Sequence, residues 1–217
     1  MGKIHIYCMP GLAASPKIFE YLHLPSEKYK LHLLEWLIPD SFDESITEYT
    51  FRLSKKIKHE NPVLVGVSFG GIIVQELCKV ISARKVILIS SVKHESEIPR
   101  RLKFIQKSKI YKLFPSKRIA SIDDFSKLAF HKSLKHKAKT YNKYLAVRND
   151  VYLNWAIYNV LNWKSDQNNE NIIHIHGEKD QIFPIKHIQN CIKIDGGTHA
   201  MILTKAHQIN ILLQEII

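Results

Sequence analysis

Apolar runs of strand length alternate with amphipathic segments over much of the 217-residue chain. Residues 62–83 read as an apolar strand that leads directly into an apolar helix. Residues 43–60 have acidic residues at the start, lysines at the end and apolar residues three or four positions apart, as a helix with a matched dipole does. Further strands are predicted at residues 3–9, 30–35, 85–90, 171–176 and 190–194, and further helices at residues 16–23 and 204–217.

The alternation of strands with helices predicts the architecture. Strands that are separated by helices form parallel sheets with right-handed crossover connections. We therefore expect an α/β fold with about six mostly parallel strands and helices on both faces of the sheet. A chain of 217 residues is long enough for one such domain with a substantial buried core.

Residues 92–164 interrupt the alternation between two predicted strands. They contain many helix formers and aromatic residues, and no strand pattern. The predicted organisation is a core made of residues 1–91 and 165–217, with residues 92–164 inserted as helices. Aromatic residues of the insertion are expected to line its underside or to pack it onto the core: Tyr111, Phe114, Phe125, Phe130, Tyr141, Tyr144, Trp155 and Tyr158.

The strand–helix junction within residues 62–83 carries the pattern Gly66-x-Ser68-x-Gly70. In a nucleophile elbow, a serine sits on a strained turn that lifts its hydroxyl above the sheet. Flanking glycines remove the Cβ atoms that would clash where strand and helix approach each other. The pattern alone is weak, because chance places one in roughly one chain in fifteen of this length. An ordinary turn serine, however, would not explain Gly66, Gly70 and Gly71 together.

An acid and a histidine follow in the loops after the two strands beyond the insertion. The first strand ends in Gly177-Glu-Lys-Asp180 and the second in Asp195-Gly-Gly-Thr-His199. Open α/β sheets bind their ligands at the carboxyl ends of strands, which makes Asp180 and His199 candidate site residues. Glu178 is the alternative to Asp180 as the acid, and Asp195 is expected to shape the turn before His199.

The order Ser68, Asp180, His199 is the order found in α/β-hydrolases, and the sequence resembles that superfamily over nearly its whole length. The most similar group is the small, lidded esterases that include carrier-protein methyl esterases and plant methyl esterases. The resemblance implies that residues 92–164 form a helical lid. It also implies a reduced α/β-hydrolase fold, because the first strand corresponds to the third strand of the family.

The resemblance further implies a catalytic triad. A serine hydroxyl is a poor nucleophile at neutral pH and needs a base within hydrogen-bond reach, which His199 would supply to Ser68. Asp180 would fix the tautomer of the imidazole and stabilise the imidazolium that forms.

An oxyanion hole is expected from two backbone N–H groups. One belongs to Phe69, directly after the nucleophile, and the other to Leu12 in the loop after the first strand. The family usually has His-Gly in that loop, whereas this chain has Pro10-Gly11.

Other residues with reactive side chains are expected to be structural. His174 and His176 share one face of a strand, but a pair without a third ligand is more often a packing feature than a metal site. Three scattered cysteines, all expected in the core, form neither a disulfide framework nor a zinc pattern: Cys8, Cys78 and Cys191. We therefore expect no metal, no cofactor and a reducing compartment, the cytoplasm. No signal-peptide pattern or run of transmembrane length is present.

The positive charge of the chain is concentrated in residues 92–164. This segment has 17 lysines and arginines against five acidic residues, which accounts for the whole net charge of +12. One explanation is a coding bias toward lysine, although bias alone should have enriched the rest of the chain as well. The other is a functional basic surface that attracts an acidic carrier protein, an anionic membrane or an anionic substrate. Nucleic acid is not expected, because no recognition motif accompanies the charge.

These observations predict a cofactor-independent serine hydrolase of a carboxylic ester, with a small-molecule or carrier-bound acyl substrate. Two alternatives remain at this stage. The first is a binding protein or receptor that retains the triad with slow turnover. The second is a thioesterase or C–C bond hydrolase of the same fold.

Overall fold

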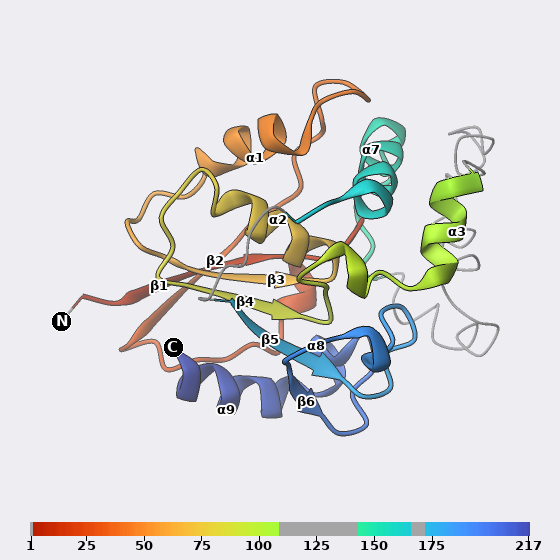
Figure 1. The fold of residues 1–217 in the computed structure, drawn as a ribbon. Coiled ribbons are helices and arrows are strands. Elements are labelled where there is room, and N and C mark those ends of the chain that lie inside the picture. Colours follow the sequence, from red (N-terminus) through yellow and green to blue (C-terminus); the bar gives the residue numbers. More distant parts are fainter. Residues whose placement is uncertain (1, 109–142, 166–171) are drawn as a thin grey trace.

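The computed structural model describes residues 2–108, 143–165 and 172–217. Within them, six strands form one sheet in the order β2-β1-β3-β4-β5-β6, and every neighbouring pair is parallel (Figure 1). The sheet confirms the predicted α/β class and its six parallel strands. The strands are β1 (Ile4–Met9), β2 (Tyr29–Leu33), β3 (Val63–Val67), β4 (Lys85–Ile89), β5 (Ile172–Gly177) and β6 (Ile192–Ile194).

Helices cover both faces of the sheet, as the pattern predicted (Figure 1). One face packs against α1 (Ile46–Ser54), α2 (Phe69–Leu77) and α7 (Asp150–Asn162), and the other against η1 (Pro16–Phe19), α8 (Met201–Thr204) and α9 (Ala206–Ile216). The remaining described helices are η2 (Glu95–Glu97), α3 (Arg100–Ser108) and η5 (Ile185–His187). No described helix is both long enough and apolar enough to cross a membrane.

Local signals explain where several elements begin and end. Ser45 caps α1, because its hydroxyl accepts the amide N–H of Glu48 while the Glu48 carboxylate accepts the amide N–H of Ser45. The helix predicted at residues 16–23 is only the short η1. It ends at Phe19, and its two buried residues are Ile18 and Phe19. The helix predicted at residues 204–217 is α9, and the short α8 precedes it, with Lys205 between the two.

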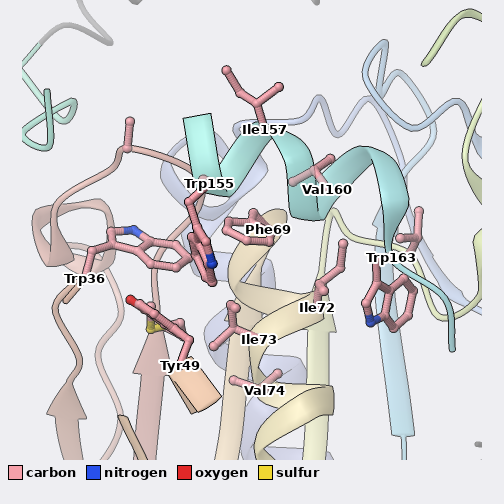
Figure 2. Close-up of a cluster of buried hydrophobic side chains, with 14 of the residues drawn as sticks. Trp36, Tyr49, Phe69, Ile72, Ile73, Val74, Trp155, Ile157, Val160 and Trp163 are labelled. Atoms are coloured by element: carbon pink, nitrogen blue, oxygen red, sulfur yellow. The ribbon is translucent and has the colours of Figure 1, made fainter. Parts of the chain in front are cut away.

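The helix α7 lies within residues 92–164 but packs as part of the core (Figure 2). Its Trp155 is 1% exposed and donates its indole N–H to the carbonyl of Glu44 at 2.7 Å. Trp163, which follows α7, donates its indole N–H to the carboxylate of Glu76 at 2.8 Å. The domain boundaries stay a prediction, but this part of the insertion is anchored to α1 and α2.

Of the insertion's aromatic residues, Tyr144 and Trp155 are buried and Tyr158 is exposed. The predictions for Tyr111, Phe114, Phe125, Phe130 and Tyr141 lie outside the described residues, as do residues 109–142 of the predicted lid.

Candidate active site

Ser68 occupies the sharp turn between β3 and α2. Its backbone has φ 52° and ψ −120°, a conformation that costs energy for any residue with a Cβ. The surrounding backbone packs closely enough to hold this turn. A Cβ added to Gly66 would lie 2.6 Å from the Cα of Gly71, and one added to Gly70 would lie 2.4 Å from the carbonyl oxygen of Met9. Glycine is therefore required where β3, α2 and the end of β1 meet.

The structure brings the predicted serine, histidine and acid together at the carboxyl ends of three strands. Ser68 follows β3, Asp180 follows β5 and His199 follows β6. The Nε2 atom of His199 lies 2.9 Å from the Ser68 hydroxyl oxygen, and its Nδ1 atom lies 2.8 Å from the Asp180 Oδ2 atom. A continuous chain of hydrogen bonds thus links the serine, the imidazole and the carboxylate.

Asp180 is held as a buried carboxylate. It is 4% exposed, and its Oδ1 atom accepts the backbone N–H groups of Ile182 at 2.7 Å and Phe183 at 3.0 Å. Burial alone would raise the pKa of Asp180. The charge and hydrogen bond of His199, the nearby His176 and the backbone amides outweigh burial and lower that pKa below its usual value. The ionised carboxylate accepts the Nδ1–H of His199, so the Nε2 lone pair of His199 faces the serine hydroxyl.

The other two candidate acids do not enter this hydrogen-bond chain. Glu178 and Asp195 are both exposed. Only Asp180, among these acids, is buried beside His199. Ser68 is half-buried and the His199 side chain is 20% exposed, so both remain open to a reactant while the carboxylate does not.

The loop that was predicted to supply Leu12 lies against the elbow. A Cβ added to Gly11 would lie 3.4 Å from the Cβ of Ser68. The indole N–H of Trp36 donates to the Gly11 carbonyl at 3.0 Å, and the amide of Ala13 donates to the Tyr152 hydroxyl at 3.0 Å. The residue between these two anchors is Leu12.

Phe69, the other predicted oxyanion donor, is the first residue of α2 and is 1% exposed. Its amide is at the positive end of the helix dipole, where a negative charge is stabilised. Gly11 and Ser68 lie close together, and Leu12 and Phe69 are the residues that directly follow them in the chain. Their role as an oxyanion hole stays a prediction.

His174 and His176 support the acid loop. The Nε2 atom of His176 donates to the Phe183 carbonyl at 2.8 Å, and its Nδ1 atom lies 3.1 Å from Nε2 of His174. Burial lowers the pKa of both histidines, and at His176 the Asp180 carboxylate and the Phe183 carbonyl offset this effect only in part. The sequence predicted that the two histidines share one face of β5. It did not predict the contact between His176 and Phe183, because that contact forms only when the loop after β5 folds back onto the strand.

Segments from residues 92–164 also contact the site loops. The guanidinium of Arg101 in α3 donates to the backbone carbonyls of Gln181 and Ile182, in the loop that carries Asp180. On the other side, the amide of Ser15 donates to the Tyr144 carbonyl at 2.7 Å, next to the loop that carries Leu12. Both contacts were missed from sequence, because they join segments far apart in the chain.

No protein-family model matches the chain, and no curated protein matches it. Solved structures do. A bromoperoxidase from Bacillus anthracis is 18% identical with a TM-score of 0.68, over 99% of this chain and 92% of that one. A lipase–esterase related protein from Clostridium acetobutylicum is 17% identical with a TM-score of 0.68, over 98% and 94% of the two chains.

An esterase from Exiguobacterium antarcticum is 17% identical with a TM-score of 0.65, over 100% of this chain and 93% of that one. An α/β-hydrolase fold protein from Burkholderia ambifaria is 14% identical with a TM-score of 0.65, over 99% and 91% of the two chains. At these low sequence identities, the similarity shows a shared fold and no more. The six-stranded parallel sheet with helices on both faces is accordingly an α/β-hydrolase fold.

Proposed function

We propose that the protein is a serine hydrolase that cleaves carboxylic esters through an acyl-enzyme on Ser68. The observation that carries the proposal is the hydrogen-bond chain from Ser68 through His199 to Asp180, with distances of 2.9 and 2.8 Å. A base within reach of the hydroxyl, itself oriented by a buried carboxylate, is the arrangement that activates a serine for acyl transfer. Esterases and lipases among the proteins of similar fold support the same class of reaction.

Each group in the site has one task in this mechanism. The Ser68 oxygen attacks the ester carbonyl carbon as its proton passes to Nε2 of His199, and the amides of Leu12 and Phe69 bind the oxyanion. The C–O bond to the alcohol then breaks, and the alcohol leaves with the proton held by His199. Water, deprotonated by His199, attacks the acyl carbon, and the carboxylic acid leaves as Ser68 regains its proton. Asp180 remains ionised throughout and stabilises the imidazolium.

The finer substrate class is part of the proposal. The resemblance to carrier-protein and plant methyl esterases suggests a small alcohol as leaving group, and the basic residues 92–164 suggest an acidic carrier-bound acyl group. Acyl transfer through Ser68 by itself does not dictate the leaving group, so a thioester or an activated C–C bond is the second candidate. A binding protein with slow turnover is the third.

Kinetics with a short p-nitrophenyl ester test the reaction class. Ser68→Ala and His199→Ala should each lower kcat about 10³-fold or more. The double variant should lose little further, because the two side chains act as a unit. Ser41→Ala, at an exposed serine remote in sequence from the elbow, is the control and should keep its activity. A serine-directed organophosphate should add one label, on Ser68.

Pre-steady-state measurements separate the enzyme from the binding protein. An ester hydrolase should release a burst of p-nitrophenol followed by steady turnover, whereas a binding protein should release at most one equivalent and stop. Near-wild-type turnover in Ser68→Ala would show that the serine hydrolase assignment is wrong. Matched oxygen esters and thioesters of one acyl group then rank the leaving groups by kcat/KM.

A further inference from the structure

Three histidines from separate segments converge on the strand pair at the edge of the sheet, outside the triad. His5 lies in β1, His32 in β2, and His59 in the connection between α1 and β3. In the register of the two strands, His32 is opposite Tyr7, two residues after His5. Side chains two residues apart in a strand share a face, so His5, Tyr7 and His32 lie on one side of the sheet. The ring of His59 stacks on that of His5 with centroids 3.4 Å apart.

The distances among these rings suit a shared metal ion. One nitrogen from each histidine lies within 4.8 Å of the other two, and Nδ1 of His5 is 2.8 Å from Nε2 of His32. Zinc binds imidazole nitrogen at about 2.0–2.1 Å in tetrahedral geometry, which places two ligand nitrogens about 3.3 Å apart. Small rotations of the side chains therefore convert the present arrangement into a ligand set. All three histidines are half-buried, which leaves room for an ion to enter.

A buried tyrosine orients one of the rings. The Tyr7 hydroxyl lies 2.7 Å from Nδ1 of His59 and accepts the backbone N–H of Lys58 at 2.9 Å. When Nδ1 of His59 also donates to this hydroxyl, its Nε2 lone pair is free to bind a metal. Metal-binding histidines usually have such a partner on their second nitrogen, which fixes both the tautomer and the ring orientation.

Charged neighbours bear on the affinity of this cluster. Lys3 and Lys30 lie near enough to His5 to act on its charge. They repel a cation and reduce its affinity, but they do not block the nitrogen ligands.

We propose that His5, His32 and His59 bind one late first-row divalent metal ion, of the class of Zn²⁺, with Tyr7 as the residue that positions His59. Three neutral nitrogen ligands favour Zn²⁺, Co²⁺, Ni²⁺ or Cu²⁺ over Mg²⁺ and Ca²⁺, which prefer oxygen. A fourth position is open to water. The site goes beyond the proposed function, because His5 is near the amino end of β1 and His59 precedes β3, whereas the triad residues follow the carboxyl ends of β3, β5 and β6. An ion there joins the edge strand β2 to β1 and to the segment before β3.

Cobalt binding to the untagged, full-length protein tests the site. The chain is first dialysed against a chelator, and Co²⁺ is then titrated while its visible d–d absorption is recorded. We expect saturation at one ion per chain, the intense absorption of a tetrahedral nitrogen site, and displacement by one equivalent of Zn²⁺. At a hundredfold excess of Zn²⁺ over its Kd, Tm should rise by roughly 5–10 °C.

Variants assign the ligands. His5→Gln, His32→Gln and His59→Gln should each weaken metal binding about 100-fold or more, and Tyr7→Phe should weaken it about 10-fold to 100-fold through loss of the hydrogen bond to His59. His23→Gln and His207→Gln, at exposed histidines elsewhere, should bind as the wild type does. Tyr7→Phe preserves volume, so it reports on the site even where a ligand variant folds poorly.

Two results would overturn the proposal. One is the absence of tetrahedral cobalt absorption in the wild type, which would leave the three rings as a hydrogen-bonded stack. The other is binding that survives in His5→Gln and is lost in His174→Gln, which would move the metal to the buried pair in β5. Ester hydrolysis by metal-free protein should equal that of the loaded protein, so a failure of this site is distinguishable from a failure of the triad.

Discussion

Asp180 makes all of its hydrogen bonds as an acceptor, and this has consequences at the scale of a single residue. Its two oxygens accept from Ile182, Phe183 and His199. An ionised carboxylate satisfies these three donors, whereas a neutral acid or amide would direct a donor of its own toward one of them. The same geometry that lowers the pKa of Asp180 therefore fixes which nitrogen of His199 carries its proton.

Asp180→Asn should lower kcat for a neutral ester on the order of 10²–10⁴-fold, and by less than Ser68→Ala does. The amide nitrogen, if it faces His199, favours the tautomer whose Nε2 atom is protonated and cannot accept the serine proton. Steady-state kinetics measure the effect. Glu178→Gln, at the exposed acid two residues earlier, should keep wild-type kcat; equal losses in both variants would contradict the assignment of the acid.

At the scale of elements, the junction of β1, β3 and α2 depends on close backbone approach. Gly70→Ala should destabilise the fold by about 1–3 kcal/mol, because the new Cβ would lie 2.4 Å from the carbonyl oxygens of Met9 and Pro10. The same clash pushes α2 away from the loop that carries Leu12, so kcat should fall as well. Denaturant unfolding and ester kinetics measure the two effects. Gly2→Ala is the matched control, since nothing lies within 4 Å of its added Cβ, and it should change neither quantity.

The buried histidines of β5 make stability depend on pH. Burial lowers the pKa of His174 and His176 in the folded state, so the folded chain excludes protons that the unfolded chain accepts. Above about pH 6.5, the ordinary pKa of an unfolded histidine, both states are neutral and there is no penalty. Below it, each histidine should reduce stability by about 1.4 kcal/mol per pH unit until the folded-state pKa is reached.

Denaturant unfolding between pH 7.5 and 5 measures this slope. His174→Gln removes one buried titratable group and should make the slope shallower by up to the same amount per pH unit. His207→Gln, at an exposed position on α9, should leave the slope unchanged. A slope identical in both variants and the wild type would mean that His174 binds a proton in the folded state.

At the scale of the whole molecule, the confinement of the net charge to residues 92–164 bears on the substrate. A basic surface beside the site would raise the rate of encounter with an acidic carrier. Arg100 and Lys107 are exposed at the two ends of α3, whereas Arg101 donates to the loop that carries Asp180. A charge reversal that includes Arg101 would disturb the triad itself, so Arg100 and Lys107 are the better positions for this test.

Arg100→Glu with Lys107→Glu should lower kcat/KM for an acyl-carrier-protein ester and spare a small neutral ester. Added salt should have the same selective effect, because exposed charges are screened beyond about 10 Å at 0.1 M. The control is Lys55→Glu with Lys56→Glu, which reverses two exposed lysines after α1, outside the insertion. Equal salt responses of the two esters, or equal losses in the two double variants, would mean that the charge of residues 92–164 reflects a coding bias toward lysine and does not recruit a carrier.

The sequence by itself determined the elements and their class. The spacing of apolar residues predicted which segments are strands and which are helices, because the buried faces of an element determine where its apolar residues stand. The alternation of these strands and helices predicted the six-stranded parallel sheet. It also singled out Ser68, Asp180 and His199, since parallel strands bring the loops after them to one edge of the sheet. Their close approach, at 2.9 and 2.8 Å, is a property of the folded chain.

Only the tertiary structure decided contacts between segments that are distant in the chain. It favoured Asp180 over Glu178 by burying one and exposing the other, although both lie in the same loop. It placed α7 in the core, where Trp155 packs against Tyr49 of α1 and Phe69 of α2, although composition alone grouped α7 with the insertion. It brought His5, His32 and His59 within reach of one ion. Sequence patterns report which face of an element is buried, but which elements meet depends on strand order and on packing over the whole sheet.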